Sequence, residues 1–408
     1  MRRTFFPLTL ALLLGISAFA IYQTSRVSTF QHQLEHTQRQ ALLQSAESMQ
    51  TLTLALEKLL ISTHAARQAE LLYDIAASAG DVQLHLASLP LEDKTLTSIL
   101  VLTGHLQADA SACLPKTTQS ALSTQDLNAF SDNLATCARL SSQLALARDD
   151  TDSQLSDALH SEEYPLVRAI EPAAPRGLPQ EEFTREQAHQ AARAFIGEDI
   201  VSQLTDAPDA SGALPAYGLT AEAGDVQLNL EITRQGGKVL WMMPETASFS
   251  IQQLPQDCIT AALSFLESRG FAACEAVHYQ IYDGLCVISA VPLQDGVLCY
   301  PDLLSIQVRM DTLQIVGLEA RSYWTNHMQR TFSPPSLSAA DARSRLSAGL
   351  VCTETRLCLI PMGSSEILCW QCSGTRNGDL YYIYIDAHSG EERAIRKVIP
   401  LESGTTAA

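Results

Sequence analysis

Two short motifs in this sequence contain residues that could do chemistry. The first is "HQLEH" at residues 32–36, which places His32 and His36 four residues apart with Glu35 between them. On a helix these histidines share one face, which is the H-x-x-E-H arrangement of a zinc peptidase. The sequence offers no identifiable third ligand and no obvious pocket-forming sheet nearby. We therefore interpret the motif as a polar helix surface and keep a metal peptidase as the alternative.

The second motif is "CWQC" at residues 369–372, which has the C-x-x-C spacing of thiol oxidoreductases or of half a zinc site. A redox pair is expected at a helix N-terminus, where the thiol pKa is lowered, but residues 367–370 follow a strand pattern. Along a strand, Cys369 and Cys372 point to opposite faces. No second C-x-x-C is present to complete a zinc site. We predict two structural cysteines and keep a thiol oxidoreductase as the alternative.

The composition restricts the possible partners and activities. The 408-residue chain has 27 Lys and Arg against 45 Asp and Glu, which gives a net charge of -18. A phosphate-binding surface would have to form against this negative field, so we expect no nucleic acid partner. The sequence also lacks G-x-S-x-G, P-loop and dinucleotide-binding motifs. We therefore expect a non-enzyme with no catalytic residues, no cofactor and no metal.

The N-terminal residues predict a single transmembrane helix. Arg2 and Arg3 precede an uncharged apolar run at residues 4–22, which is about as long as a bilayer core requires. Because arginines stay on the cytoplasmic side, residues 1–3 are expected to form a cytoplasmic tip, with the rest of the chain extracytoplasmic. The alternative is a secretory signal that is cleaved after Ala20. The ten cysteines are compatible with disulfides in an exported chain, but their spacing does not define the pairing.

Residues 23–163 have the composition of a helical bundle. Glycine, proline and aromatic residues are rare there, and leucines recur at helical spacing. Residues 123–126 resemble a capping box that opens the last helix. We predict an antiparallel bundle of about four helices joined near Pro90 and Pro115, with one long stalk as the alternative. Residues 164–182 are rich in proline and predict a linker.

The chain beyond this linker contains a threefold repeat. Helix-like segments begin at residues 183, 254 and 337, and each is followed by a strand-turn-strand pattern that begins at residue 226, 303 or 380. We predict three tandem small α+β modules, followed by a disordered tail. Their boundaries are expected at 183–247, 248–332 and 333–400, with the tail at 401–408.

Four aromatic residues are the candidates for a partner-binding surface. Trp241, Trp324 and Trp370 provide one tryptophan for each module, and each is either a core residue or a partner contact. Tyr300 belongs to a Tyr-Pro-Asp turn that is expected to enter a strand, and it is kept as a further partner contact.

The repeat resembles the PepSY domain, because each copy is a helix followed by strands and the last ends in "IDAHSG". The whole layout is similar to the YpeB family of sporulation and germination proteins, most specifically in "ITRQGGKVLWMM", "RSYWTNHMQR" and "YYIYIDAHSGEE". The second copy departs from the pattern, since it has Thr312-Leu313-Gln314 in place of the turn glycine and its helix opens at Pro255.

The resemblance implies a non-catalytic, membrane-anchored spore protein. Its implied partner is a spore cortex-lytic hydrolase similar to SleB, which it would stabilise, localise or restrain at the cortex side of the spore inner membrane, close to peptidoglycan. An extracytoplasmic ligand sensor is a further alternative. The few residues predicted before the anchor leave no output domain for such a sensor.

Overall fold

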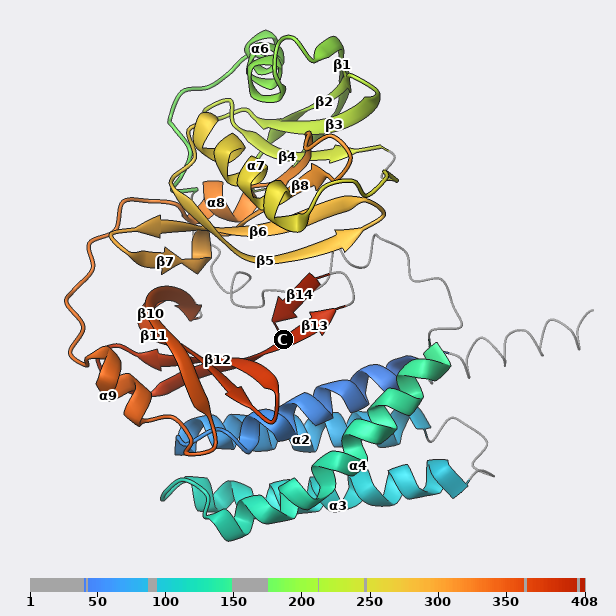
Figure 1. Cartoon of the computed structure of the whole chain (residues 1–408), viewed down its shortest axis with the longest axis vertical. Helices are drawn as coiled ribbons and strands as arrows, with labels where there is room; N and C mark the ends of the chain where they lie inside the picture. Colours follow the sequence, from blue (N-terminus) through green and yellow to red (C-terminus); the bar gives the residue numbers. More distant parts are fainter. Residues whose placement is uncertain are drawn as a thin grey trace, which may run out of the picture. The chain divides into compact units, whose positions relative to one another are not determined.

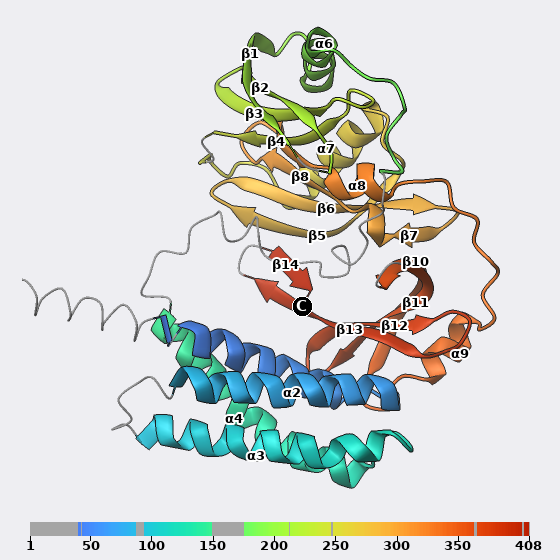
Figure 2. The same cartoon turned by 180° about the vertical axis from the view of Figure 1, so that it is seen from behind.

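The computed structural model describes residues 40–148 and 175–407, apart from 42, 87–93, 212, 246–247, 363–364 and 402–403. Two compact units make up the chain, a helical unit and a C-terminal unit, and the latter also includes residues 61–64. Figures 1 and 2 show the elements of each unit from opposite sides. The predicted order of helices followed by a mixed helix and sheet region is confirmed at this level.

The described part of the helical unit contains a helix at 40–59 and the helices α2 (Ala65–Leu86), α3 (Lys94–Thr117) and α4 (Thr124–Arg148). Its leucines form one core, to which Phe130 contributes the largest fully buried side chain. The predicted capping box is confirmed, because Ser123 and Asp126 each accept a hydrogen bond from the other's backbone N–H. Pro115 lies within the last turn of α3.

The predicted membrane anchor at residues 4–22 and the "HQLEH" motif lie outside the described residues. Among the helices that the structure does describe, none combines the length and the apolar character needed to cross a bilayer.

The C-terminal unit begins with α6 (Arg185–Ile196), which Thr184 caps, and the strands β1 (Val201–Ala210), β2 (Ala216–Ala223), β3 (Val226–Thr233) and β4 (Val239–Pro244). Residues 175–182, which were predicted as part of a linker, instead pack against this unit. The backbone N–H of Gly177 donates to the carbonyl of Trp324 at 3.0 Å, and Leu178 is buried in the core.

The second helix and sheet segment has α7 (Pro255–Ser268), followed by β5 (Cys274–Tyr282), β6 (Leu285–Gln294) and β7 (Val297–Cys299). It continues with the 3-10 turn η1 (Tyr300–Asp302), β8 (Leu304–Arg309), β9 (Ile315–Glu319) and α8 (Arg321–Asn326). Pro255 occupies the first helical turn of α7, where its missing N–H costs no hydrogen bond.

The third segment has the short helix α9 (Ala339–Ser344) and the strands β10 (Val351–Met362), β11 (Ser365–Arg376), β12 (Asp379–Asp386) and β13 (Glu392–Leu401). The structure differs from the prediction of a disordered tail, because residues 404–407 form β14 (Gly404–Ala407). This strand pairs with β13 and, at Gly404, with Gln280 of β5, so its backbone groups gain partners on both sides.

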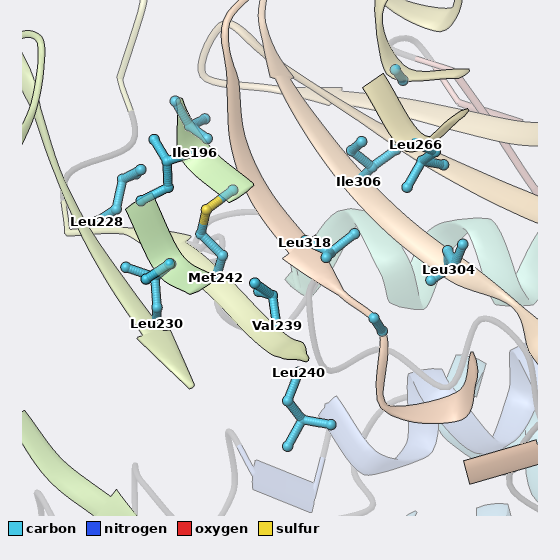
Figure 3. Close-up of a cluster of buried hydrophobic side chains, with 14 of the residues drawn as sticks. Ile196, Leu228, Leu230, Val239, Leu240, Met242, Leu266, Leu304, Ile306 and Leu318 are labelled. Atoms are coloured by element: carbon cyan, nitrogen blue, oxygen red, sulfur yellow. The ribbon is translucent and has the colours of Figure 1, made fainter. Parts of the chain in front are cut away.

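The first two segments share one hydrophobic core. Strand β4 pairs with β9 through Trp241 opposite Glu319 and Met242 opposite Leu318, which joins the two sheets. Figure 3 shows the result, in which Leu230, Met242 and Leu318 lie in one cluster with residues of β8 and α7. The helices α6 and α7 also touch, since the rings of Phe195 and Phe265 lie 5.3 Å apart. The first two repeats therefore form a single folded body.

The second and third segments are joined by a closed ring of paired strands. The ring runs in the order β6, β5, β14, β13, β12, β11, β10 and β7, and β7 pairs back to β6. Strand β7 pairs in parallel with β10, at Leu298 opposite Cys358. The ring encloses a cluster that includes Val291, Tyr300 and Tyr384. Closure leaves these strands without a free edge, which removes a site of unwanted pairing.

The turns predicted between the repeated strands are present. Gly236 and Gly237 have φ of 77° and 58° between β3 and β4, and Gly390 has φ of 75° between β12 and β13. In the second copy, which lacks a turn glycine, Leu313 adopts φ of 63°. A β-sheet turn of this hand needs positive φ, so a non-glycine residue carries the strain here.

Candidate partner-binding surface

Trp324 is a core residue at the junction of the first two segments. Its side chain is 8% exposed, and its indole Nε1 donates to the carbonyl of Val239 at 2.9 Å. The rings of Phe271 and Tyr323 pack against it at centroid distances of 5.3 Å and 4.9 Å. The apolar ring of Trp324 is therefore packed, and its N–H is hydrogen-bonded, within the protein. Little of Trp324 is left for a partner.

Tyr300 is buried inside the strand ring. It is 3% exposed, and its hydroxyl donates to Oε1 of Gln371 on β11 at 2.7 Å. Burial raises the pKa of this hydroxyl well above its ordinary value, so it remains a neutral donor. Tyr300 therefore binds the second segment to the third and presents almost no surface of its own.

Trp370 and Trp241 are the two candidates that keep accessible surface, since both are only partly buried. The indole of Trp370 on β11 donates to the carbonyl of Leu337 at 2.9 Å, and its ring packs in a cluster with Phe332 and Leu368. Trp241 lies on β4, opposite Glu231 of β3 and Glu319 of β9. The prediction of partner contacts stays open for these two tryptophans.

A buried ionic cluster fixes the segment that connects the second and third repeats. The guanidinium of Arg330 makes two 2.7 Å hydrogen bonds to the carboxylate of Asp302, and it also binds both oxygens of Glu366 on β11. Asp302 is fully buried and accepts a third contact from Nδ1 of His327 at 2.7 Å. Burial opposes the charged form of Arg330, but the bonds to Glu366 and Asp302 raise its pKa, so it stays charged.

Two open clefts lie along this connecting segment, and both are lined by residues 330–333. One has a volume of about 490 Å³, and the other, on the side of Pro334 and Pro335, has a volume of about 430 Å³. The first cleft combines apolar and charged side chains, namely Met328, Phe332, Leu359, Leu368, Glu366 and Asp386, and the second shares Phe332 and Leu368 with it. Apolar walls with a few polar groups are typical of binding sites for peptides and other ligands.

A smaller groove of about 260 Å³ lies beside Trp324, between the C-terminal ends of α6 and α7. Its cations are already engaged by the protein. Arg269 donates to the carbonyl of Phe195 at 2.5 Å, and Lys238 lies 5.4 Å from the ring of Trp324. The two clefts beside the connecting segment are larger, and we take them as the candidates.

The "CWQC" pair lies on β11, and its two thiols belong to different hydrophobic clusters, as the strand alternation predicted. Both cysteines are fully buried. Burial raises the pKa of Cys369, and it raises that of Cys372 to about 11. A thiol with a raised pKa is a poor nucleophile at neutral pH, so this pair lacks the activation of a thiol oxidoreductase. Within the described residues, no group of His, Cys, Asp or Glu side chains could hold a metal ion.

The ionic cluster around Arg330 was not predicted from the sequence. Arg330 follows α8 in a segment that resembles any polar connection, and its partners Asp302 and Glu366 are distant in sequence. The available signal was the segment "RSYWTNHMQR", in which aromatic and charged residues precede a proline-rich stretch. This segment indicates that the connection is structured, but it does not indicate that Arg330 binds Asp302 and Glu366.

Comparison with known proteins supports a family assignment. Residues 154–333 match the family described as YpeB sporulation, PepSY1 and PepSY2 domains. The chain is similar to the sporulation protein YpeB of Halalkalibacterium halodurans, with 30% identity over 224 residues that cover 54% of this chain and 50% of that protein. It is also similar to YpeB of Bacillus subtilis, with 28% identity over 226 residues that cover 54% and 50%.

The chain spans about half the length of these curated relatives. Among solved structures, it matches the C-terminal domain of YpeB from Bacillus megaterium with 24% identity and a TM-score of 0.49. This match covers 54% of this chain and 100% of that domain.

Proposed function

We propose, from the premise that this chain belongs to the YpeB family of sporulation proteins over residues 154–333, that it is a non-catalytic protein that stabilises a spore cortex-lytic hydrolase. Membership of this family supports a role related to spore germination. The relatives are named as sporulation proteins and not as enzymes, which is compatible with a non-enzymatic role.

The observation that best supports this proposal is the pair of clefts lined by Phe332 and Leu368, in a unit whose segments are joined by strand pairing. Both clefts lie along one connecting segment, which Arg330 fixes to β11. A rigid surface of this kind loses little conformational freedom when a partner binds. The reactive groups that a thiol enzyme would need are buried and protonated instead. This combination favours binding over catalysis.

Binding would protect a stored hydrolase by mass action. A protein that binds only the native state of its partner raises the partner's free energy of unfolding. The increase is about 2.7 kcal/mol when the free concentration of the binding protein is about 100 times the Kd. A hydrolase that is kept for long periods beside its peptidoglycan substrate needs such protection. We expect the C-terminal unit to supply it, and the helical unit to hold the assembly at the membrane.

Deletion of residues 183–400 tests this division of roles. Spores that carry the anchor and helices alone should lack the hydrolase protein while its transcript stays at the normal level. If the hydrolase persists at the normal level in those spores, the C-terminal unit is not its stabiliser, and a ligand-sensing function becomes the better explanation.

A pair of point variants then tests the clefts. Met328 lines the larger cleft and is 40% exposed, whereas Ile251 is 63% exposed and does not line it. Both side chains can be exchanged for aspartate with little cost to folding, because surface substitutions change stability by about 0.5 kcal/mol. Met328→Asp should reduce the hydrolase level in spores, and Ile251→Asp should not. Equal levels in the two variants would place the binding surface elsewhere.

The proposed location is the spore inner membrane, with the bulk of the chain on the cortex side. Support comes from Arg2 and Arg3 ahead of an apolar run of spanning length. Protease added to right-side-out protoplasts should digest the C-terminal unit. Recovery of a mature chain that begins at Ile21 would instead identify residues 1–20 as a cleaved signal.

A further inference from the structure

Six of the ten cysteines stand in pairs that sequence spacing does not reveal. All ten are free thiols, and in each of these pairs the two cysteines come from different elements. The pairs are Cys258 of α7 with Cys286 of β6, Cys358 of β10 with Cys369 of β11, and Cys352 of β10 with Cys372 of β11. Any disulfide of this unit would therefore form across elements and not within "CWQC".

The third pair is brought together by an irregularity in strand pairing. The β10–β11 register shifts between Cys352 and Glu354, so that Cys352 pairs with Gly374 and Thr355 pairs with Cys372. An extra residue at such a bulge re-aims the side chains beside it. Cys352 consequently packs against the same hydrophobic cluster as Cys372.

The hydroxyl of Thr355 lies near the sulfur atoms of both Cys352 and Cys372. Oγ1 of Thr355 lies 3.5 Å from Sγ of Cys352 and 3.9 Å from Sγ of Cys372. Both thiols therefore contact the same hydroxyl and lie in the same cluster. Cys352 and Cys372 are diagonal neighbours on adjacent antiparallel strands, so a disulfide between them requires the backbone at the bulge to adjust.

Access to solvent separates this pair from the other two. Cys258, Cys286, Cys358 and Cys369 are each 0% exposed, so an oxidant cannot reach them without unfolding. Cys352 is partly exposed. Since thiol–disulfide exchange needs direct access to the sulfur, only the third of these pairs is open to reagents in the folded protein.

We propose that Cys352 and Cys372 form a disulfide by exchange with a low-molecular-weight disulfide, and that this bond ties the start of β10 to β11. The Cys352 thiolate attacks one sulfur of the reagent and expels the other as a thiolate, which leaves a mixed disulfide. Cys372 then loses its proton to water, attacks the sulfur of Cys352 and expels the second thiolate. Two protein thiols are oxidised, and the reagent is reduced to two thiols.

The order of these steps follows from burial. Cys372 is fully buried, and burial raises the pKa of its thiol to about 11, so it is the poorer first nucleophile. Once Cys352 holds the mixed disulfide, the short distance between the two residues favours the second attack. Cys369 takes no part, because it belongs to the cluster on the opposite face of β11.

The experiment treats the reduced full-length chain in detergent with oxidised glutathione, at a pH near the ordinary thiol pKa of about 8.5. Free thiols should fall from ten to eight, and peptide mapping should place the new bond between Cys352 and Cys372. The Cys372→Ser variant should accumulate a glutathione adduct at Cys352. The Cys352→Ser variant should keep its nine thiols, and the control Cys369→Ser should still lose two.

Three results would overturn the proposal. The first is a bond that maps within "CWQC" or to one of the two fully buried pairs. The second is a glutathione adduct at Cys352 that persists in the unsubstituted chain. The third is the retention of all ten thiols. Mapping in the unsubstituted chain decides among these results even where a serine variant does not fold.

Discussion

At the scale of single residues, Arg330 joins the second and third segments through two carboxylates. Its side chain is 6% exposed, that of Glu366 is 16% exposed, and Asp302 is fully buried. A buried pair of this kind gains little over a well-packed apolar pair, but the removal of one partner leaves an uncompensated charge inside the protein. Arg330 is therefore important because its removal would leave the buried carboxylate of Asp302 without its cation.

The substitution Arg330→Met should lower the free energy of unfolding by about 3–5 kcal/mol, because Asp302 would keep its charge without its main partner. Urea unfolding of the wild type and the variant measures this difference. The control is Arg321→Met, which removes the ion pairs with Glu231 and Glu319 from a side chain that is 52% exposed. Exposed ion pairs contribute about 0–1 kcal/mol, so the control should unfold close to the wild type. Equal losses in the two variants would contradict the role assigned to Arg330.

The residue scale also shows what the sequence could and could not predict about the site. Its strand pattern correctly separated Cys369 from Cys372, because alternation along a strand is a local property. The same local reasoning could not separate Trp324, which is 8% exposed, from Trp370, which is partly exposed. Burial depends on which strands pair, and that information is non-local.

At the scale of elements, three hairpin turns share one local signal. Asp283-Gly284, Asp295-Gly296 and Asn377-Gly378 each connect antiparallel strands through two residues that both have positive φ. An Asx-Gly pair between alternating apolar residues is a strong sequence signal for a hairpin with this turn. These three hairpins were predictable from sequence. The pairing of β14 with β5 was not, since β5 lies more than a hundred residues earlier.

Two of these glycines allow a matched test of turn packing. At Gly284, which has φ of 77°, a Cβ would lie 2.0 Å from the carbonyl oxygen of Phe249. Left-handed strain costs about 1–2 kcal/mol, and forced displacement of packed backbone adds about 1–3 kcal/mol. Gly284→Ala should therefore lower the free energy of unfolding by about 2–5 kcal/mol in urea unfolding.

Gly296 is the control for this test. It has φ of 80°, and a Cβ there would meet no atom within 4 Å. The substitution Gly296→Ala should cost the strain alone, about 1–2 kcal/mol. If both variants lose the same stability, the contact with Phe249 adds nothing and strain accounts for both effects.

At the scale of the whole molecule, the three repeats do not fold as separate domains. The pairings of β4 with β9, of β7 with β10 and of β14 with β5 join them into one unit. The sequence predicted three helix and strand copies, because each copy is encoded by local periodicity. It could not predict the pairings between copies, because the residues of an edge strand do not specify which distant strand it will pair with.

His278 lies within the ring of strands that joins the second and third segments. It is on β5 and is 7% exposed, and its imidazole is 5.9 Å from the ring of Tyr382 on β12. Burial lowers the pKa of His278 to about 4 in the folded protein. An unfolded chain returns this histidine to its ordinary pKa of about 6.5. Between these two values the unfolded state binds a proton that the folded state does not.

The free energy of unfolding should therefore fall as the pH is lowered from about 6.5 to about 4, by up to about 3 kcal/mol from His278 alone. Carboxylates also begin to titrate at the lower end, so the test compares the wild type with His278→Gln, which stays neutral throughout. Urea unfolding across this range should give two curves that converge as the pH falls, because the variant lacks this one term. Parallel curves would mean that His278 is protonated in the folded ring, and that the junction between the segments is more hydrated than its burial indicates.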